Sequence, residues 1–181
     1  LQRFAARAWR RSVQPGETAP LVKLVRNAEK GGSTTEAAIK EGLKAILCSP
    51  EFLYREEKED ALTGHEIASR LSYFLWSSMP DEELFAAARS GQLNDPKERS
   101  RQVERMLKDV KAEAFVRHFP SAWLRLDKLG DMPPSGGDYQ FYKNLKVEPM
   151  LAKQVTTYFA EILETNGRID QFIDSDYTYM N

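Results

Sequence analysis

Apolar residues recur every three to four positions along most of the chain, a spacing typical of α-helices that bury one face. Gly, Pro and clusters of polar residues interrupt this pattern and mark the ends of the predicted helices. We predict helices at about 1–11, 17–30, 34–48, 64–77, 79–90, 95–108, 109–126 and 148–165. No run alternates apolar and polar residues as a strand would. The chain is therefore predicted to be all-α, a bundle of about seven to eight helices in two packed helical subdomains.

A charged run, EEKED at residues 56–60, is predicted to be a solvated linker. It would separate an N-terminal three-helix subdomain, residues 1–57, from a C-terminal helical domain, residues 61–181. Just before it, the turn that begins at Ser49 and Pro50 is predicted to fold Phe52, Leu53 and Tyr54 back onto the core. The chain opens within a helical pattern and without a methionine. We therefore expect a truncated excerpt of a longer protein, in which a missing targeting signal is uninformative.

The most distinctive segment is LTGHEIASRLSYFLWSSMPDEEL, residues 62–84. Thr63 and Glu66 have the spacing of a capping box, in which each side chain bonds the backbone N–H of the other residue. Four apolar residues that follow at helical spacing are predicted to face the core. They are Ile67, Leu71, Phe74 and Leu75.

Two prolines lead to predictions about where one helix begins and where another is interrupted. Pro80 is predicted in the first turn of a helix that Ser78 or Met79 caps, where the missing N–H of proline has no cost. Pro120 lies inside the helix predicted at 109–126 and is expected to kink or split it, because proline removes a hydrogen bond and clashes with the preceding turn.

The composition, 41% hydrophobic and 29% charged over 181 residues, is ordinary for a globular protein. The net charge of −1 provides no overall attraction to nucleic acid, and no apolar run approaches the roughly 18 residues of a membrane span. Residues 1–30 are locally basic, with seven Lys or Arg against two Glu. This surface could meet phosphate or dock an absent domain, and we expect no nucleic-acid partner. The lone Cys48 excludes an internal disulfide and is expected to be buried.

Candidate chemistry is sparse. The sequence HEIAS begins like the zinc-binding motif H-E-x-x-H, but Ser69 stands where the second histidine is needed. His65 and His118 are 53 positions apart and could meet only through the fold. Asp81 opens an acidic first helical turn, where a carboxylate more often stabilises the helix dipole than transfers protons. These three residues are the weak catalytic candidates, and no metal or cofactor site is predicted in the chain. The haem attachment motif C-x-x-C-H is absent.

The segments SPEFLYR and SRLSYFLWSSMPDEEL, with the tail FIDSDYTYMN, carry a family resemblance. The chain is similar to two consecutive planctomycete-type domains of unknown function. That resemblance implies a large exported protein, located in the periplasm, cell envelope or outside the cell. It also implies haem in an upstream c-type cytochrome domain, neighbouring domains of the same polypeptide as partners, and a glycan or electron-transfer partner. It supplies no catalytic residue, and Gln154 stands where relatives tend to have glutamate.

Two functional hypotheses follow. The leading one is a helical structural or interaction module of a larger exported, cytochrome-c-linked protein, which predicts an apolar, partly exposed surface for docking. The alternative is part of a redox or carbohydrate-acting enzyme whose cleft is completed by absent domains. It predicts a pocket in which His65 or His118 meets an acid such as Asp81 or Asp131. His65 is the residue of its segment that capping and core packing do not require.

Overall fold

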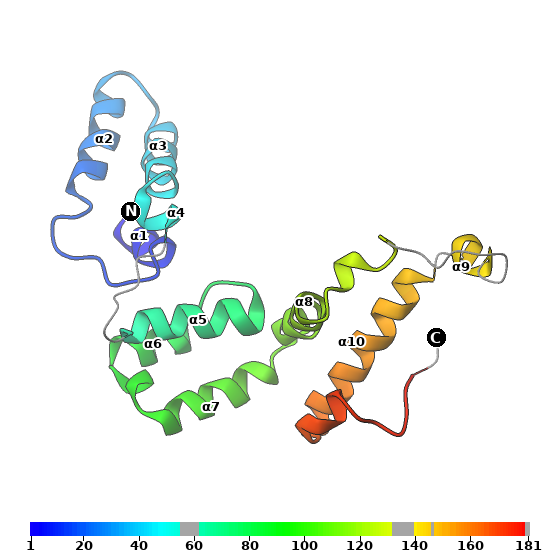
Figure 1. Ribbon diagram of the computed structural model, residues 1–181. Helices are drawn as coiled ribbons and strands as arrows, with labels where there is room; N and C mark the ends of the chain where they lie inside the picture. The colour runs from blue at the N-terminus through cyan, green and yellow to red at the C-terminus, as the bar shows by residue number, and fades with distance from the viewer. Residues whose placement is uncertain (55–61, 132–139, 146, 180–181) are drawn as a thin grey trace. The chain divides into compact units, whose positions relative to one another are not determined.

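The computed structural model describes residues 1–54, 62–131, 140–145 and 147–179 (Figure 1). Within these ranges the chain forms α-helices joined by short turns and 3₁₀-helices, without a strand. The predicted all-α class is confirmed. The linker predicted at 56–60 lies outside the described residues, so the domain boundary stays a prediction.

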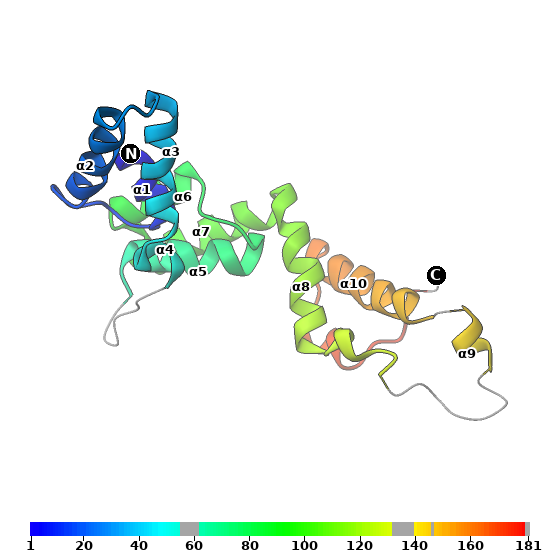
Figure 2. The same ribbon diagram turned by 90° about the horizontal axis from the view of Figure 1, so that it is seen from above.

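The N-terminal region contains four helices. They are α1 (Gln2–Ala8), α2 (Ala19–Lys30), α3 (Thr35–Leu47) and α4 (Pro50–Leu53). Helices α2 and α3 lie side by side in both ribbon views (Figures 1 and 2). Thr34 caps α3, its hydroxyl accepting a hydrogen bond from the Ala37 amide. The core around Trp9 and Ile46 includes Phe52 as predicted, but Leu53 and Tyr54 are exposed.

Cys48 corrects a second prediction about this region. It follows α3 as the C-cap residue, and its side chain is exposed. Helix α3 ends at Leu47, and Ile46 is its last buried residue, so Cys48 lies beyond the part of the helix that faces the core. The expectation of a buried thiol was therefore wrong.

The middle of the chain contains α5 (Gly64–Trp76), α6 (Glu82–Arg89), the short 3₁₀-helix η1 (Gln92–Asn94) and α7 (Pro96–Leu107). The predicted capping box is confirmed at the start of α5. The Thr63 amide donates to the Glu66 carboxylate at 2.6 Å, and the Glu66 amide donates to the Thr63 hydroxyl at 3.3 Å. Local capping chemistry therefore fixes where α5 begins.

The buried face of α5 differs from the predicted one. Leu75 is buried as predicted, but Ile67 and Leu71 are only half-buried and Phe74 is 55% exposed. The small residues Gly64, Ala68 and Ser72 are buried instead. A Cβ on Gly64 would lie 2.6 Å from the carbonyl oxygen of Ala88, so the backbones of α5 and α6 approach very closely there. Periodicity favoured large apolar residues along the whole helix, but the close approach to α6 near Gly64 places small residues in the first part of the buried face.

The start of α6 also corrects a prediction. Asp81, not Ser78 or Met79, is the N-cap residue, and its carboxylate accepts a hydrogen bond from the Leu84 amide at 2.9 Å. Pro80 precedes the cap and is fully buried. Proline thus ends the incoming segment here and is not part of the first helical turn.

The C-terminal region contains two main helices and several short elements. These are η2 (Val110–Ala112), α8 (Glu113–Trp123), η3 (Leu126–Lys128), α9 (Gln140–Leu145), α10 (Glu148–Glu164) and η5 (Ile169–Phe172). Pro120 lies inside α8, which continues to Trp123, so the predicted split does not occur. Helices α8 and α10 lie side by side (Figures 1 and 2).

Contacts divide the chain into two compact units. Unit 1 comprises residues 1–74 and 78–106, and unit 2 comprises residues 75–77 and 107–181. The last two residues of α5, Leu75 and Trp76, thus belong to unit 2, where the Lys111 ammonium lies 4.4 Å from the centre of the Trp76 ring.

Candidate functional site

His65, the first candidate, lies half-buried in the first turn of α5 in unit 1. Its ring is 6.5 Å, centre to centre, from that of Phe85 on α6. Burial, and then the positive charge of Arg89, lower the pKa of His65 below its usual value. A neutral imidazole packed beside an aromatic ring is a structural contact. This contact accounts for a residue whose presence the sequence pattern left unexplained.

Asp81, the second candidate, is held by two sets of bonds. One carboxylate oxygen caps α6, and Arg105 of α7 binds both oxygens, at 2.7 and 3.1 Å. The hydrogen bond to Asp81 raises the pKa of Arg105, because it favours the charged guanidinium. A carboxylate engaged in this way fastens α7 to the start of α6.

The same surface of unit 1 carries further charged pairs. Gln102 of α7 is fully buried and donates to Glu83 at 3.2 Å and to Glu98 at 3.0 Å. Arg101 binds both oxygens of Glu98, and together with Gln102 it lowers the pKa of Glu98 to about 2. This acid–base network joins α6 and α7. Its acids are balanced by arginines, which is typical of a structural network.

His118, the third candidate, lies exposed on α8 in unit 2. Its Nδ1 atom is 2.8 Å from the hydroxyl oxygen of Ser77, whose backbone is left-handed with a φ of 50°. Asp131, the other acid considered as a partner, forms an ion pair with Lys128 at 3.3 Å. The acids proposed as partners of a histidine are thus held by Arg105 and Lys128.

In the part of the chain that the structure describes, no group of three or more His, Cys, Asp and Glu side chains could hold a metal ion. Over the same residues, no helix combines the length and apolarity needed to cross a bilayer.

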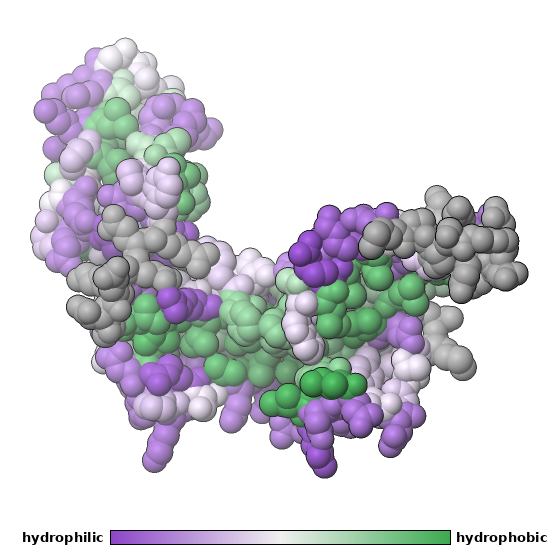
Figure 3. Space-filling view, viewed as in Figure 1, coloured by the Kyte–Doolittle hydropathy of each residue, from purple (hydrophilic) through white to green (hydrophobic). Residues whose placement is uncertain are grey.

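Unit 2 contains a groove with a volume of about 330 Å³. Three segments that are distant in the sequence form it: the end of α8, the middle of α10 and the segment after α10. The lining residues are Pro120, Trp123, Leu124, Gln154, Val155, Tyr158, Phe159, Phe172 and Thr178. Figure 3 shows hydrophobic residues gathered over α8 and α10 on one face. The volume lies at the lower end of the range typical of ligand pockets.

Aromatic rings form the floor of this groove. Phe159, which is buried, lies between Phe119 of α8 and Phe172 of η5, at 5.6 and 5.2 Å between ring centres. Trp123 meets Phe172 edge to face at 6.0 Å. Trp123 is nevertheless 49% exposed and its neighbour Leu124 is 46% exposed. The groove therefore has a firmly packed floor and an apolar edge open to solvent.

Hydrogen bonds tie the segment after α10 back onto that helix. Gln154 donates to the Thr178 hydroxyl at 2.7 Å, and the Tyr158 hydroxyl donates to the carbonyl of Gln171 at 2.8 Å. The hydroxyl of Tyr179 bonds the Glu161 carboxylate, which raises the pKa of Tyr179 to about 12. One wall of the groove is thus a strap, residues 169–179, fastened along α10.

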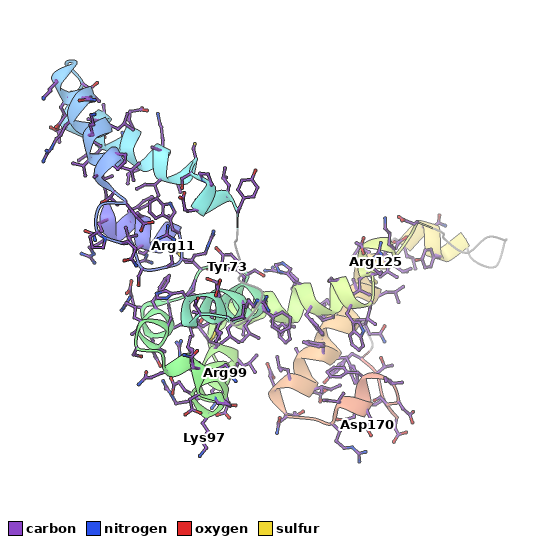
Figure 4. All side chains as sticks on the ribbon, turned by 60° about the vertical axis from the view of Figure 1, so that its left-hand side comes forward. Arg11, Tyr73, Lys97, Arg99, Arg125 and Asp170 are labelled. Atoms are coloured by element: carbon purple, nitrogen blue, oxygen red, sulfur yellow. The ribbon has the colours of Figure 1, made fainter. Side chains whose placement is uncertain are left out.

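Charge is distributed unevenly around the groove. The lining residues carry no charge at neutral pH, but residues 161–179 contain five acids and a single basic residue, Arg168. Asp174 and Asp176 lie between the lining residues Phe172 and Thr178, and both are exposed. Figure 4 labels Arg125, just after α8, and Asp170, within η5. The strap gives the groove an acidic border.

Sequence reasoning missed this groove. The apolar spacing within the helices predicted at 109–126 and 148–165 includes Trp123, Leu124 and Val155 among the core positions, and the tail served only as a mark of the family resemblance. The available signals were the polar residue Gln154 next to the apolar residues of its helix and the aromatic residues of the tail. Neither signal reveals that segments near 123, 155 and 175 meet.

The helices and the groove define the class as an all-α multi-helix protein with an apolar groove in unit 2. Residues 62–181 match the family described as PSD4, a protein of unknown function (DUF1592), and the chain belongs to that family. Residues 1–57 match a second family, PSD5, also of unknown function (DUF1595). The resemblance to two consecutive domains of this set is confirmed. Searches among curated proteins and among solved structures each found no match.

Proposed function

We propose that this chain is a helical interaction module of a larger exported, cytochrome-c-linked protein, and that the groove of unit 2 docks a neighbouring domain or partner. The observation that carries the proposal is the open apolar edge at Trp123 and Leu124. The export and the cytochrome link rest on the family resemblance described above.

The energetics support docking at this edge. Burying a large apolar side chain stabilises a complex by roughly 25 cal/mol per Å² of apolar area removed from water. The two half-exposed side chains at the groove edge would each contribute about 1 kcal/mol if covered. The packed rings beneath them limit their motion, so little additional ordering opposes binding. A rigid aromatic anchor in a concave surface is typical of interaction hot spots.

The alternative function, part of a redox or carbohydrate-acting enzyme, requires a histidine beside an available acid. Asp81 is bound by Arg105, and Asp131 is paired with Lys128. His65 packs against Phe85, and His118 bonds Ser77. The interaction module therefore has the better support from the geometry.

Oxidative footprinting of tryptophan tests the proposal. The full-length polypeptide and the chain of residues 1–181 are exposed to hydroxyl radicals, and modification of each tryptophan is measured by mass spectrometry. We expect the modification rate of Trp123 to fall several-fold in the full-length protein. Trp9 and Trp76, only 8% and 3% exposed, serve as internal references whose rates stay low in both samples.

A double substitution at the groove edge, compared with a matched control, provides a second test of docking. Trp123→Ala with Leu124→Ala should loosen the docked arrangement, measured as faster limited proteolysis of the full-length protein. Leu53→Ala with Tyr54→Ala, which alters another adjacent apolar pair that is exposed, serves as the matched control. Equal Trp123 reactivity in both samples, with equal proteolysis of both variants, would contradict docking at this groove.

A further inference from the structure

We infer that the groove of unit 2 receives a peptide segment that inserts apolar side chains and carries Lys or Arg residues beside them. The inference rests on the proposed docking function and names the chemistry of the partner.

The groove lining indicates the apolar part of this partner. Six of its residues are apolar, and they come from both helices and the strap: Pro120, Trp123, Leu124, Val155, Phe159 and Phe172. The polar groups are largely engaged, since Gln154 binds Thr178 and the Tyr158 hydroxyl binds the Gln171 carbonyl. A ligand rich in hydroxyl groups would find few free donors and acceptors here, whereas leucine or phenylalanine side chains need none.

The border of the groove indicates the charged part. Asp174 and Asp176 are exposed within the segment that joins Phe172 to Thr178. Glu161 adds a third acid beside the strap, since it accepts from the hydroxyls of Tyr177 and Tyr179. These acids attract a basic partner and repel nucleic acid or anionic lipid.

Nearby cations only partly offset the acids. Lys153 precedes the lining residue Gln154 and is exposed. Arg125 follows Leu124 but pairs with Asp127 at 3.4 Å, and Arg168 pairs with Asp170. Residues 161–179 retain a net charge of −4, from five acids and one arginine. Charge complementarity therefore favours Lys or Arg on the partner near the strap.

The floor formed by α8 and α10 suits a helical partner. Two neighbouring helices can accept the apolar face of a third, whose anchors recur every three to four residues. A basic amphipathic helix presents such anchors with Lys on its flanks. The partner is thus defined by two features that can be varied separately, its apolar face and its flanking charge.

Three labelled peptides of about 16 residues test the inference, a length that gives about four helical turns. The first has Leu and Phe at helical spacing with Lys on the flanks. The second replaces Lys with Glu, and the third keeps Lys but replaces the apolar face with Ser. Binding to the purified chain is measured by fluorescence anisotropy at low ionic strength. We expect the first peptide to bind about tenfold or more tightly than either of the others.

Variants of the protein assign this preference to the groove. Trp123→Ala should weaken the first peptide at least several-fold. Asp174→Asn with Asp176→Asn should reduce the preference for Lys over Glu. Glu29→Gln with Glu104→Gln removes the same number of exposed acids from unit 1 and should leave the preference unchanged.

Each contrary result has a distinct meaning. If the Glu peptide or the Ser peptide binds as tightly as the first peptide, the inferred partner chemistry is overturned. The proposal that the groove docks a partner is not affected by that result. The inferred partner chemistry is also overturned if neutral oligosaccharides protect Trp123 from oxidation and the first peptide does not bind. A dimer of the chain that Trp123→Ala dissociates would assign the groove to a second copy and also overturn the inference. Failure of docking itself appears separately, as unchanged Trp123 reactivity in the full-length protein.

Discussion

At the scale of single residues, small side chains decide how closely α5 and α6 pack. Gly64, Ala68 and Ser72 are buried on α5, and Ala87 and Ala88 are buried on α6. A hydrophobic periodicity scale gives little weight to these residues, so the sequence favoured Phe74 and Leu71 for the core. Close approach of two backbones depends on both helices at once, and periodicity within one helix does not contain that information.

Gly64→Ala tests this packing. The added Cβ would lie 2.6 Å from the Ala88 carbonyl oxygen, which is backbone and cannot rotate away. The helices must separate, and we expect a loss of about 1–3 kcal/mol in the free energy of unfolding, measured by urea denaturation. Gly31→Ala is the control, because its Cβ would meet neighbours at an ordinary 3.4 Å. Similar stability of both variants would show that α5 and α6 are less closely packed.

At the scale of helices, capping was the most predictable feature. The box of Thr63 and Glu66 and the cap at Thr34 depend on residues three positions apart, so the sequence alone reveals them. Asp81 was recognised as an acid favoured at a helix start, but not as the cap itself. Its bond to Arg105 spans 24 positions and required the fold.

Asp81→Ala should destabilise the protein more than removal of an ordinary cap. It removes the bond to the Leu84 amide and both bonds from Arg105, which keeps its longer ion pair with Glu83 at 3.4 Å, so we expect a loss of about 2–3 kcal/mol. Asp95→Ala is the matched comparison, because Asp95 accepts from the Lys97 amide at an exposed helix start and should cost about 1 kcal/mol. Thermal or urea unfolding measures both. Equal losses would mean that the Arg105 contact contributes nothing.

The strap on α10 is a second feature of element scale. Tyr158→Phe removes the hydrogen bond to the Gln171 carbonyl but keeps the ring in the groove. We expect amide hydrogen exchange of residues 169–179 to accelerate several-fold, with little change in the exchange of α8. Tyr54→Phe, at an exposed site in unit 1, should change neither. Unchanged exchange in the strap would show that other contacts alone hold it.

At the scale of the whole molecule, the all-α class and most helix positions followed from sequence, because they depend on local periodicity. The groove did not, because its three walls come from residues near 123, 155 and 175. Of the candidate residues, His65, Asp81 and His118 were found in contacts with Phe85, Arg105 and Ser77. The sequence identified unusual residues, and only the fold showed what each one touches.

Stability of the whole protein should fall in acid. Arg11 lowers the pKa of Glu17 to about 2, and Arg101 lowers that of Glu98 to about 2, from 4.5 in each case. A lowered folded-state pKa stabilises the protein above pH 4.5, and this stabilisation is lost as the pH falls from 4.5 towards 2. Urea unfolding over this interval should show a smaller decline for Glu17→Gln with Glu98→Gln than for the wild type. Parallel declines would contradict the shifts.

The half-exposed indole of Trp123 at the groove edge also gives the protein an intrinsic fluorescence signal that depends on the state of the groove. The chain has three tryptophans, and Trp9 and Trp76 are buried, so acrylamide should quench the emission of Trp123 preferentially. The quenchable fraction then measures how much of the protein has an open groove. Occupancy could be followed in a mixture without attaching a dye, and the colour of the emission would shift to the blue as water leaves the ring.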